Sequence, residues 1–125
     1  MSIAALAYID NLMKSIGIPY EFMRWNARER PDPYFLGEYI ENPSPYREEN
    51  GHSQTTFIIR GYTRGPWMGL EQAKAKIEAN VAKTAILDDG SGIAVFYDAA
   101  SPVPTADADV KSIKINLTIQ EWRVN

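Results

Sequence analysis

The strongest constraint on the fold is a strict alternation of side chains near the end of the chain. In the stretch VKSIKINLTIQEWRV, residues 110–124, aliphatic and polar side chains alternate. The aliphatic members are Ile113, Ile115, Leu117 and Ile119, and the polar members are Ser112, Lys114, Asn116, Thr118 and Gln120. Because successive side chains of a strand point to opposite faces, this pattern predicts a strand of an antiparallel sheet with one face on the core. The apolar phase then shifts to Trp122 and Val124, which predicts a bulge or a change of partner strand.

Five more segments are predicted as strands from their β-branched and aromatic residues and from the turn residues between them. They are residues 18–25, 34–41, 54–64, 84–87 and 92–99. In the third of them Phe57, Ile58 and Ile59 follow one another, which predicts burial on both faces of the sheet. The stretch SPVPTADAD, residues 101–109, is predicted as a long polar loop.

Two helices are predicted from apolar residues at three- and four-residue spacing. The first begins after the cap residue Ser2 and runs to about residue 16, with a stripe made of Ile3, Leu6, Ile9, Leu12, Met13 and Ile16. The second begins near Pro66 or Trp67 and runs to about Lys83, because proline suits a first helical turn. Its inner stripe is Leu70, Ala73, Ile77 and Val81, and Glu71 and Lys74 lie on its solvated face.

The predicted order is a helix, two or three strands, a helix, and two or three strands. This order predicts an α+β fold, namely a single antiparallel β-sheet with two α-helices packed on one face and long hairpin loops. A length of 125 residues suits a single domain over residues 1–125, which can bury a real core. Hydrophobic residues at 45% and charged residues at 23% are typical of a globular chain.

Charge and composition argue against several classes of function. A formal net charge of -3 provides no basic excess, so we expect no specific nucleic-acid binding and no attraction to membranes. The absence of cysteine excludes disulfides, cysteine–zinc sites and thiol nucleophiles. We expect no membrane span, because the apolar runs are short, and no secretory signal at the N-terminus.

The single histidine lies in the polar stretch NPSPYREENGHS, residues 42–53. A general base needs a nucleophile or an orienting carboxylate within reach, and only Glu48 and Glu49 are near His52 in the sequence. An exposed loop histidine explains the residue more simply than catalysis does. We expect neither a metal site, a cofactor nor an enzymatic activity, since metal-ligand spacing and phosphate-binding glycine motifs are both missing.

The running order of segments resembles a known family. The resemblance lies in four segments that follow an amphipathic helix and the stretch GIPYEF. They are residues 33–41 (PYFLGEYIE), 56–65 (TFIIRGYTRG), 70–81 (LEQAKAKIEANV) and 113–122 (IKINLTIQEW). In order and spacing they resemble the tail-completion or tail-terminator proteins of long-tailed phages and prophages, which are minor tail or head-tail joining proteins. The resemblance covers nearly the whole chain.

The resemblance implies a structural protein rather than an enzyme. It implies a homohexameric ring that caps the tail tube, with the tail-tube protein and the head-connector protein as further partners, and a location in the virion tail or in the host-cell cytoplasm before assembly. A ring built head to tail needs two different complementary patches on each subunit. We expect the two polar segments 42–53 and 101–109 to supply ring or partner contacts through Tyr46, Arg47, Glu48, Glu49, His52, Pro102, Pro104 and Asp107.

Two other functions stay open at this point. One is a small ligand-binding or regulatory α+β domain without catalytic activity, which would use a pocket between the sheet and the helices. The other is an enzyme that relies on His52 with Glu48 or Glu49.

Overall fold

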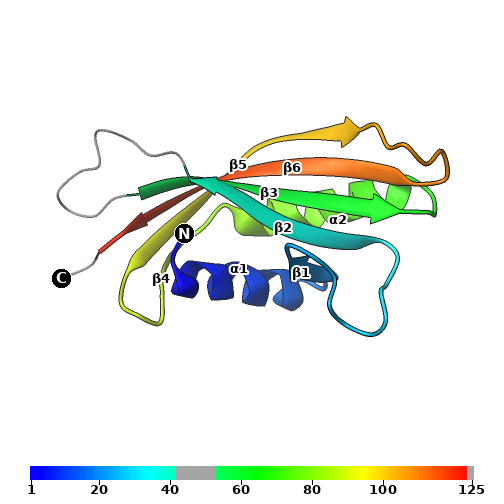
Figure 1. The fold of residues 1–125 in the computed structure, drawn as a ribbon. Helices are drawn as coiled ribbons and strands as arrows, with labels where there is room; N and C mark the ends of the chain where they lie inside the picture. The colour runs from blue at the N-terminus through cyan, green and yellow to red at the C-terminus, as the bar shows by residue number, and fades with distance from the viewer. Residues whose placement is uncertain (42–52, 124–125) are drawn as a thin grey trace.

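The computed structural model describes residues 1–41 and 53–123 of the chain (Figure 1). The elements follow the predicted order. They are α1 (Ile3–Ser15), β1 (Tyr20–Phe22), β2 (Tyr34–Glu41), β3 (Ser53–Thr63), α2 (Met68–Val81), β4 (Thr84–Ile86), β5 (Gly92–Val103) and β6 (Lys111–Trp122). The fold is therefore α+β, as predicted.

The strands form one six-stranded sheet in the order β1-β2-β3-β6-β5-β4, which curls into a half-barrel. The prediction of a purely antiparallel sheet is wrong, because β1 and β2 run parallel, with Tyr20 opposite Phe35. Residues 23–33 lead the chain from the end of β1 back to the side where β1 began, so that both strands point the same way. Every other pair is antiparallel.

The core lies against the sheet face formed by the odd-numbered residues of β2, β3 and β6. Side chains of this face, of α1 and of α2 belong to one buried cluster, whose fully buried members include Phe35, Phe57, Ile59, Ile9 and Ile77. The predicted stripe of α2 is confirmed in full, since Leu70, Ala73, Ile77 and Val81 are all buried. The consecutive burial of Phe57, Ile58 and Ile59 is confirmed as well.

The predicted stripe of α1 is wrong at its first member. The buried residues of α1 are Ala5, Ile9 and Met13, which follow one another at four-residue spacing. Ile3 opens the helix outside this stripe, and its side chain is 87% exposed.

β6 pairs with β3 as far as Glu121 and with β5 as far as Trp122, with no irregularity at this end, so the predicted bulge or change of partner strand is wrong. Glu121 takes the next core position after Ile119 and is only 7% exposed. Its carboxylate accepts a hydrogen bond from the hydroxyl of Ser2, and that hydroxyl also accepts one from the Ala5 amide as the cap of α1. The irregularity of the sheet lies instead in β5, between Tyr97 and Ala99.

The predicted loop 101–109 begins too early, because residues 101–103 belong to β5. The long β6 provides a partner for each of them, from Ser101 opposite Lys114 to Val103 opposite Ser112. β4 pairs only with residues 92–94, so the rest of β5 is an edge strand. Proline is tolerated on edges because the missing N–H interrupts no ladder there, and Pro102 fits this rule.

Candidate interaction surface

The contact residues predicted from the sequence fall into two groups. Tyr46, Arg47, Glu48, Glu49 and His52 lie outside the described residues 1–41 and 53–123. Pro102, Pro104 and Asp107 are exposed at the β5–β6 hairpin. A carboxylate oxygen of Asp107 lies 3.2 Å from the guanidinium of Arg64, so an ion pair links this hairpin to the turn after β3.

The sheet face opposite the core is formed by the even-numbered residues of β2, β3 and β6. The strand register arranges this outer face in rows that cross the sheet. One row contains Tyr34, Tyr62, Ser112 and Val103, and the next contains Leu36, Arg60, Lys114 and Ser101. Residues that lie far apart in the sequence thus become neighbours on one surface.

Tyr34 is the centre of an aromatic and basic cluster on this face. Its ring stacks on Tyr62 with 5.3 Å between the ring centroids, and the Trp25 ring meets it edge-on at 6.0 Å. The guanidinium carbon of Arg30 lies 4.4 Å from the Tyr34 centroid, which is a cation–π contact. We call Arg30, Tyr34, Arg60, Tyr62 and Lys114 the arginine–tyrosine patch.

Burial affects one phenol of the patch. It raises the pKa of Tyr62, although the nearby Arg60 guanidinium acts in the opposite direction. Tyr62 therefore stays a neutral hydrogen-bonding group at neutral pH.

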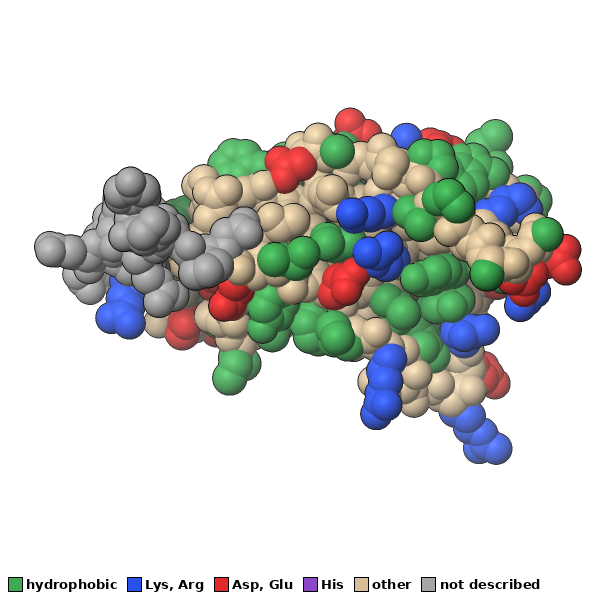
Figure 2. Space-filling view, turned by 45° about the horizontal axis from the view of Figure 1, so that its top comes forward, with side chains coloured by type: hydrophobic (Ala, Val, Ile, Leu, Met, Phe, Trp, Pro, Cys, Tyr) green, Lys and Arg blue, Asp and Glu red, His purple; other side chains and the backbone are tan. Residues whose placement is uncertain are grey.

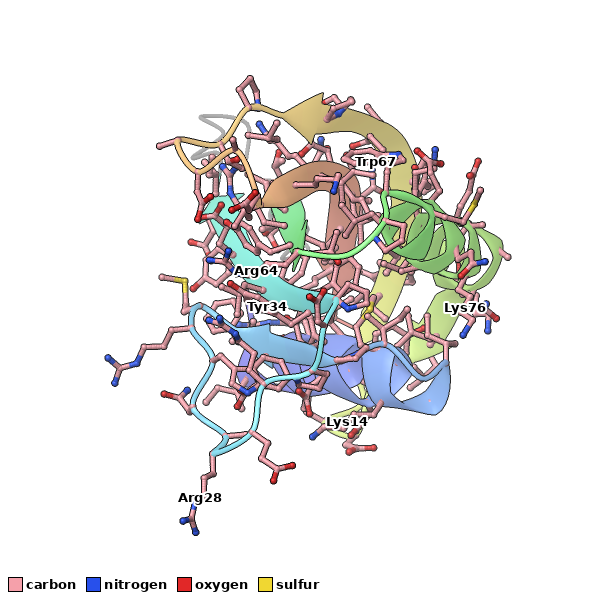
Figure 3. The ribbon with its side chains drawn as sticks, turned by 90° about the vertical axis from the view of Figure 1, so that its right-hand side faces the viewer. Lys14, Arg28, Tyr34, Arg64, Trp67 and Lys76 are labelled. Carbon is pink, nitrogen blue, oxygen red and sulfur yellow. The ribbon has the colours of Figure 1, made fainter. Side chains whose placement is uncertain are left out.

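The loop between β1 and β2, residues 23–33, is fixed by contacts within its own end of the molecule. The carboxylate of Glu21 accepts hydrogen bonds from the backbone amides of Asn26 and Ala27, and the Trp25 indole donates to the Glu29 carbonyl oxygen at 2.9 Å. These contacts position three exposed arginines, Arg24, Arg28 and Arg30. Figure 3 shows Arg28 projecting from this loop below Tyr34 and Arg64.

Several carboxylates near the patch are already bound within the chain. Glu38 pairs with Arg60 at 2.6 Å across β2 and β3. Asp32 accepts from the Thr63 hydroxyl and from the Arg64 backbone amide, and these two bonds hold its pKa below the ordinary value. The pKa of Asp107 is lowered by the backbone amide of Asp109 and then by Arg64. In Figure 2 most of the Lys and Arg side chains lie over the right-hand half of the face, with Asp and Glu side chains among them.

The other half of the outer face carries exposed apolar side chains among polar ones. Ile40 and Phe96 are 55% and 47% exposed and lie in one row with Thr56 and Thr118. Ile86, on the neighbouring edge strand, is 65% exposed. The outer face therefore combines a mixed half, with exposed apolar side chains, and a basic and aromatic half.

Sequence reasoning missed the arginine–tyrosine patch. The interleaving of arginines and aromatic residues in MRWNARERPDPY, residues 23–34, was a usable signal. The contribution of Arg60, Tyr62 and Lys114 was hidden, because it depends on the strand register.

Within residues 1–41 and 53–123 no group of three His, Cys, Asp or Glu side chains is placed to hold a metal ion. None of the described helices is long and apolar enough to span a membrane. Comparison with known proteins adds no identification, because no protein-family model matches the chain and no curated protein matches it.

Proposed function

We propose that this protein is a structural subunit of a phage or prophage tail. In this proposal it acts as a tail terminator, whose homohexameric ring caps the tail tube and joins it to the head connector. The proposal draws on the resemblance of residues 33–41, 56–65, 70–81 and 113–122 to that family. It assigns the chain no enzymatic activity and no cofactor, and it places the protein in the virion tail, or in the host-cell cytoplasm before assembly.

The observation that supports the proposal best is that the sheet has two unlike edges, each only partly covered. Within the described residues, β1 pairs with residues 35–37 of β2. Residues 38–41 of β2 therefore have no described neighbouring strand on the β1 side. On the opposite edge, β4 pairs with residues 92–94, the Val95 amide donates to the Lys83 carbonyl oxygen, and β5 is uncovered from Phe96 onward. A closed ring uses two different surfaces of each subunit, and uncovered strand edges are templates for pairing between chains.

The placement of the helices supports the same proposal. We infer that both helices pack on one face of the sheet, since residues from each belong to the same buried cluster. In Figure 1 α1 lies below the sheet, and α2 is seen behind β2 and β3. The outer face then stays available for a neighbouring subunit, the tube or the connector. Pro102, Pro104 and Asp107 lie at one end of this face and remain proposed contact residues.

The test is the mass of the particles that the protein forms. Light scattering at several concentrations, followed by negative-stain imaging, is performed on the protein alone and after addition of the tail-tube protein of the same phage or prophage. We expect six-fold rings in at least one of these samples. A protein that forms no ring and binds neither the tube protein nor the connector would contradict the proposal, and a monomer or dimer that binds a small molecule would favour the ligand-binding alternative.

Two matched variants make the test specific. Phe96 and Met68 are both exposed apolar residues, at 47% and 63%, but Phe96 lies on the uncovered part of β5 and Met68 at the start of α2. We expect Phe96→Asp to abolish ring formation and Met68→Asp to leave it intact, with unchanged circular dichroism in both variants.

A further inference from the structure

We infer that the arginine–tyrosine patch is a docking site for a short acidic segment of a partner protein. The inference goes beyond the proposed ring, because it concerns one end of the outer face and the chemistry of what binds there. It would hold for any protein partner, whether or not that partner belongs to a tail.

The first step is the balance of charge at this end of the molecule. Among the described residues, Arg24, Arg28, Arg30 and Lys114 make no ion pair with a carboxylate. The nearby carboxylates of Glu38 and Asp107 are paired with Arg60 and Arg64, and those of Glu21 and Asp32 bind backbone amides. With the carboxylate of Glu29 included, which is unpaired among the described residues, the cations here outnumber the carboxylates by one, although the whole chain carries -3. The cations are Arg24, Arg28, Arg30, Arg60, Arg64 and Lys114, and the carboxylates are Glu21, Glu29, Asp32, Glu38 and Asp107.

The second step is the rigidity of the cations. Arg30 is held over the Tyr34 ring at 4.4 Å, and Arg60 is fixed by Glu38. Lys114 projects from β6 next to Arg60, because the two residues are paired in the register. Trp, Tyr and Arg are the residues that most often dominate protein–protein binding, since they provide a large contact area with little loss of conformational freedom.

The third step is the spacing of the cations. Tyr34 on β2 and Lys114 on β6 are separated by two strand spacings and one row, which amounts to about 12 Å at ordinary sheet dimensions. An extended segment covers this distance in about four residues. Two carboxylates at that separation could reach Arg30 and Lys114 together, and carboxylates bind guanidinium groups through paired hydrogen bonds.

A nucleic acid fits the same surface less well. Single-stranded nucleic acid binds by stacking its bases on open aromatic faces along a basic groove. The Tyr34 ring is already contacted by Arg30, Trp25 and Tyr62, so a base would have to displace one of them.

The experiment measures binding of a fluorescein-labelled oligoglutamate peptide by anisotropy at low and at physiological salt. Two other probes are an oligoglutamine peptide of equal length and a single-stranded oligothymidine of equal charge. The inference predicts binding of the glutamate peptide, weaker or absent binding of the other two, and amide shift changes in NMR spectra that centre on Tyr34, Tyr62 and Lys114.

Charge-removing variants locate the site. We expect Arg28→Ser with Arg30→Ser to weaken binding of the glutamate peptide roughly ten-fold, and Lys114→Ser roughly three-fold. The matched control is Lys76→Ser with Lys83→Ser, which removes two exposed cations on and after α2 and is expected to change binding less than about two-fold. Figure 3 shows Lys76 on the opposite side of the molecule from Arg28.

Three results would overturn the inference. One is a failure of oligoglutamate to bind at the patch, seen either as no binding at low salt or as binding that both pairs of variants weaken equally. Another is tighter binding of oligothymidine, which would assign the surface to nucleic acid. The third is self-association that Arg28→Ser with Arg30→Ser abolishes, which would show that a second copy of the chain occupies the patch. The first two results leave ring formation with the tube protein untouched, so this inference and the proposed function can fail separately.

Discussion

Asn116 is the residue whose environment fits its chemistry least. It lies on the outer face of the sheet between Ile58 and Ala99. Its side-chain oxygen is buried, and it finds no hydrogen-bond partner among the described residues. A buried acceptor without a partner costs about 1–3 kcal/mol, because the hydrogen bonds it made with water in the unfolded chain are not replaced.

We therefore expect Asn116→Val to raise the free energy of unfolding by about 1 kcal/mol. Valine also prefers strands, so Gln120→Val on the same face of β6 serves as the control for that preference. Urea denaturation of the three proteins measures the difference. An Asn116→Val protein that gains no more than Gln120→Val would show that the amide oxygen is satisfied in solution.

At the scale of elements, glycines determine how closely the strands and aromatic side chains approach. A Cβ atom on Gly61 of β3 would overlap the ring of Phe35, its neighbour on β2, and one on Gly37 would lie 2.8 Å from Cζ of Phe57. Both aromatic rings are fully buried. The two glycines thus leave the space that these core side chains fill.

The connection between the 23–33 loop and β3 depends on pH. It consists of the Asp32 carboxylate, the Thr63 hydroxyl and the Arg64 amide. The folded-state pKa of Asp32 lies below its ordinary value of 3.8, so the ionised group stabilises the fold above pH 3.8. That stabilisation is lost as the pH falls through the lower folded-state pKa.

We expect Asp32→Asn to lower the free energy of unfolding at pH 7, with a difference from the parent protein that shrinks as the pH falls below 3.8. Denaturant titrations across this range measure the difference. Asp88→Asn is the control, because Asp88 is an exposed turn residue for which the described structure records no side-chain hydrogen bond. A deficit of Asp32→Asn that is constant over the whole pH range would contradict the linkage.

Patterns within single elements allowed much of this fold to be predicted. The period of α2 identified all four of its buried residues, and alternation identified the buried face of β6 from Ile113 to Ile119. The parallel pairing of β1 was not predictable, because a three-residue strand has no period that distinguishes its direction. The burial of Glu121 was missed because its partner, Ser2, lies 119 positions away.

At the scale of the whole molecule, the candidate site was harder to predict than the fold. The arginine–tyrosine patch joins residues from the 23–33 loop and from β2, β3 and β6, which only the strand register makes adjacent. Alternation tells which face a residue occupies, whereas it does not tell which residue of another strand lies beside it. Surface sites that span several strands are therefore the part of such a protein that single-sequence reasoning predicts least well.

The same topology predicts how the molecule opens. β3 and β6 are long central strands with a neighbour on each side, whereas β1 and β4 are three-residue strands at the two edges. Local opening should release the edges first, because few contacts hold them. We expect amide hydrogens of β3 and β6 to exchange only through global unfolding, and those of β4 to exchange faster through local opening.

Gly61→Ala makes this prediction quantitative. Because the new methyl group overlaps Phe35, we expect the global free energy of unfolding to fall by about 2 kcal/mol. Exchange of the β3 and β6 amides should then accelerate about 30-fold, while the β4 amides keep their rates, since local opening does not disturb β3. Gly65→Ala is the matched control, because its Cβ would meet nothing closer than the Thr63 hydroxyl oxygen at 3.4 Å. Equal acceleration in β4 and β6 would mean that the sheet opens as one unit, and that its edges are as firmly held as its centre.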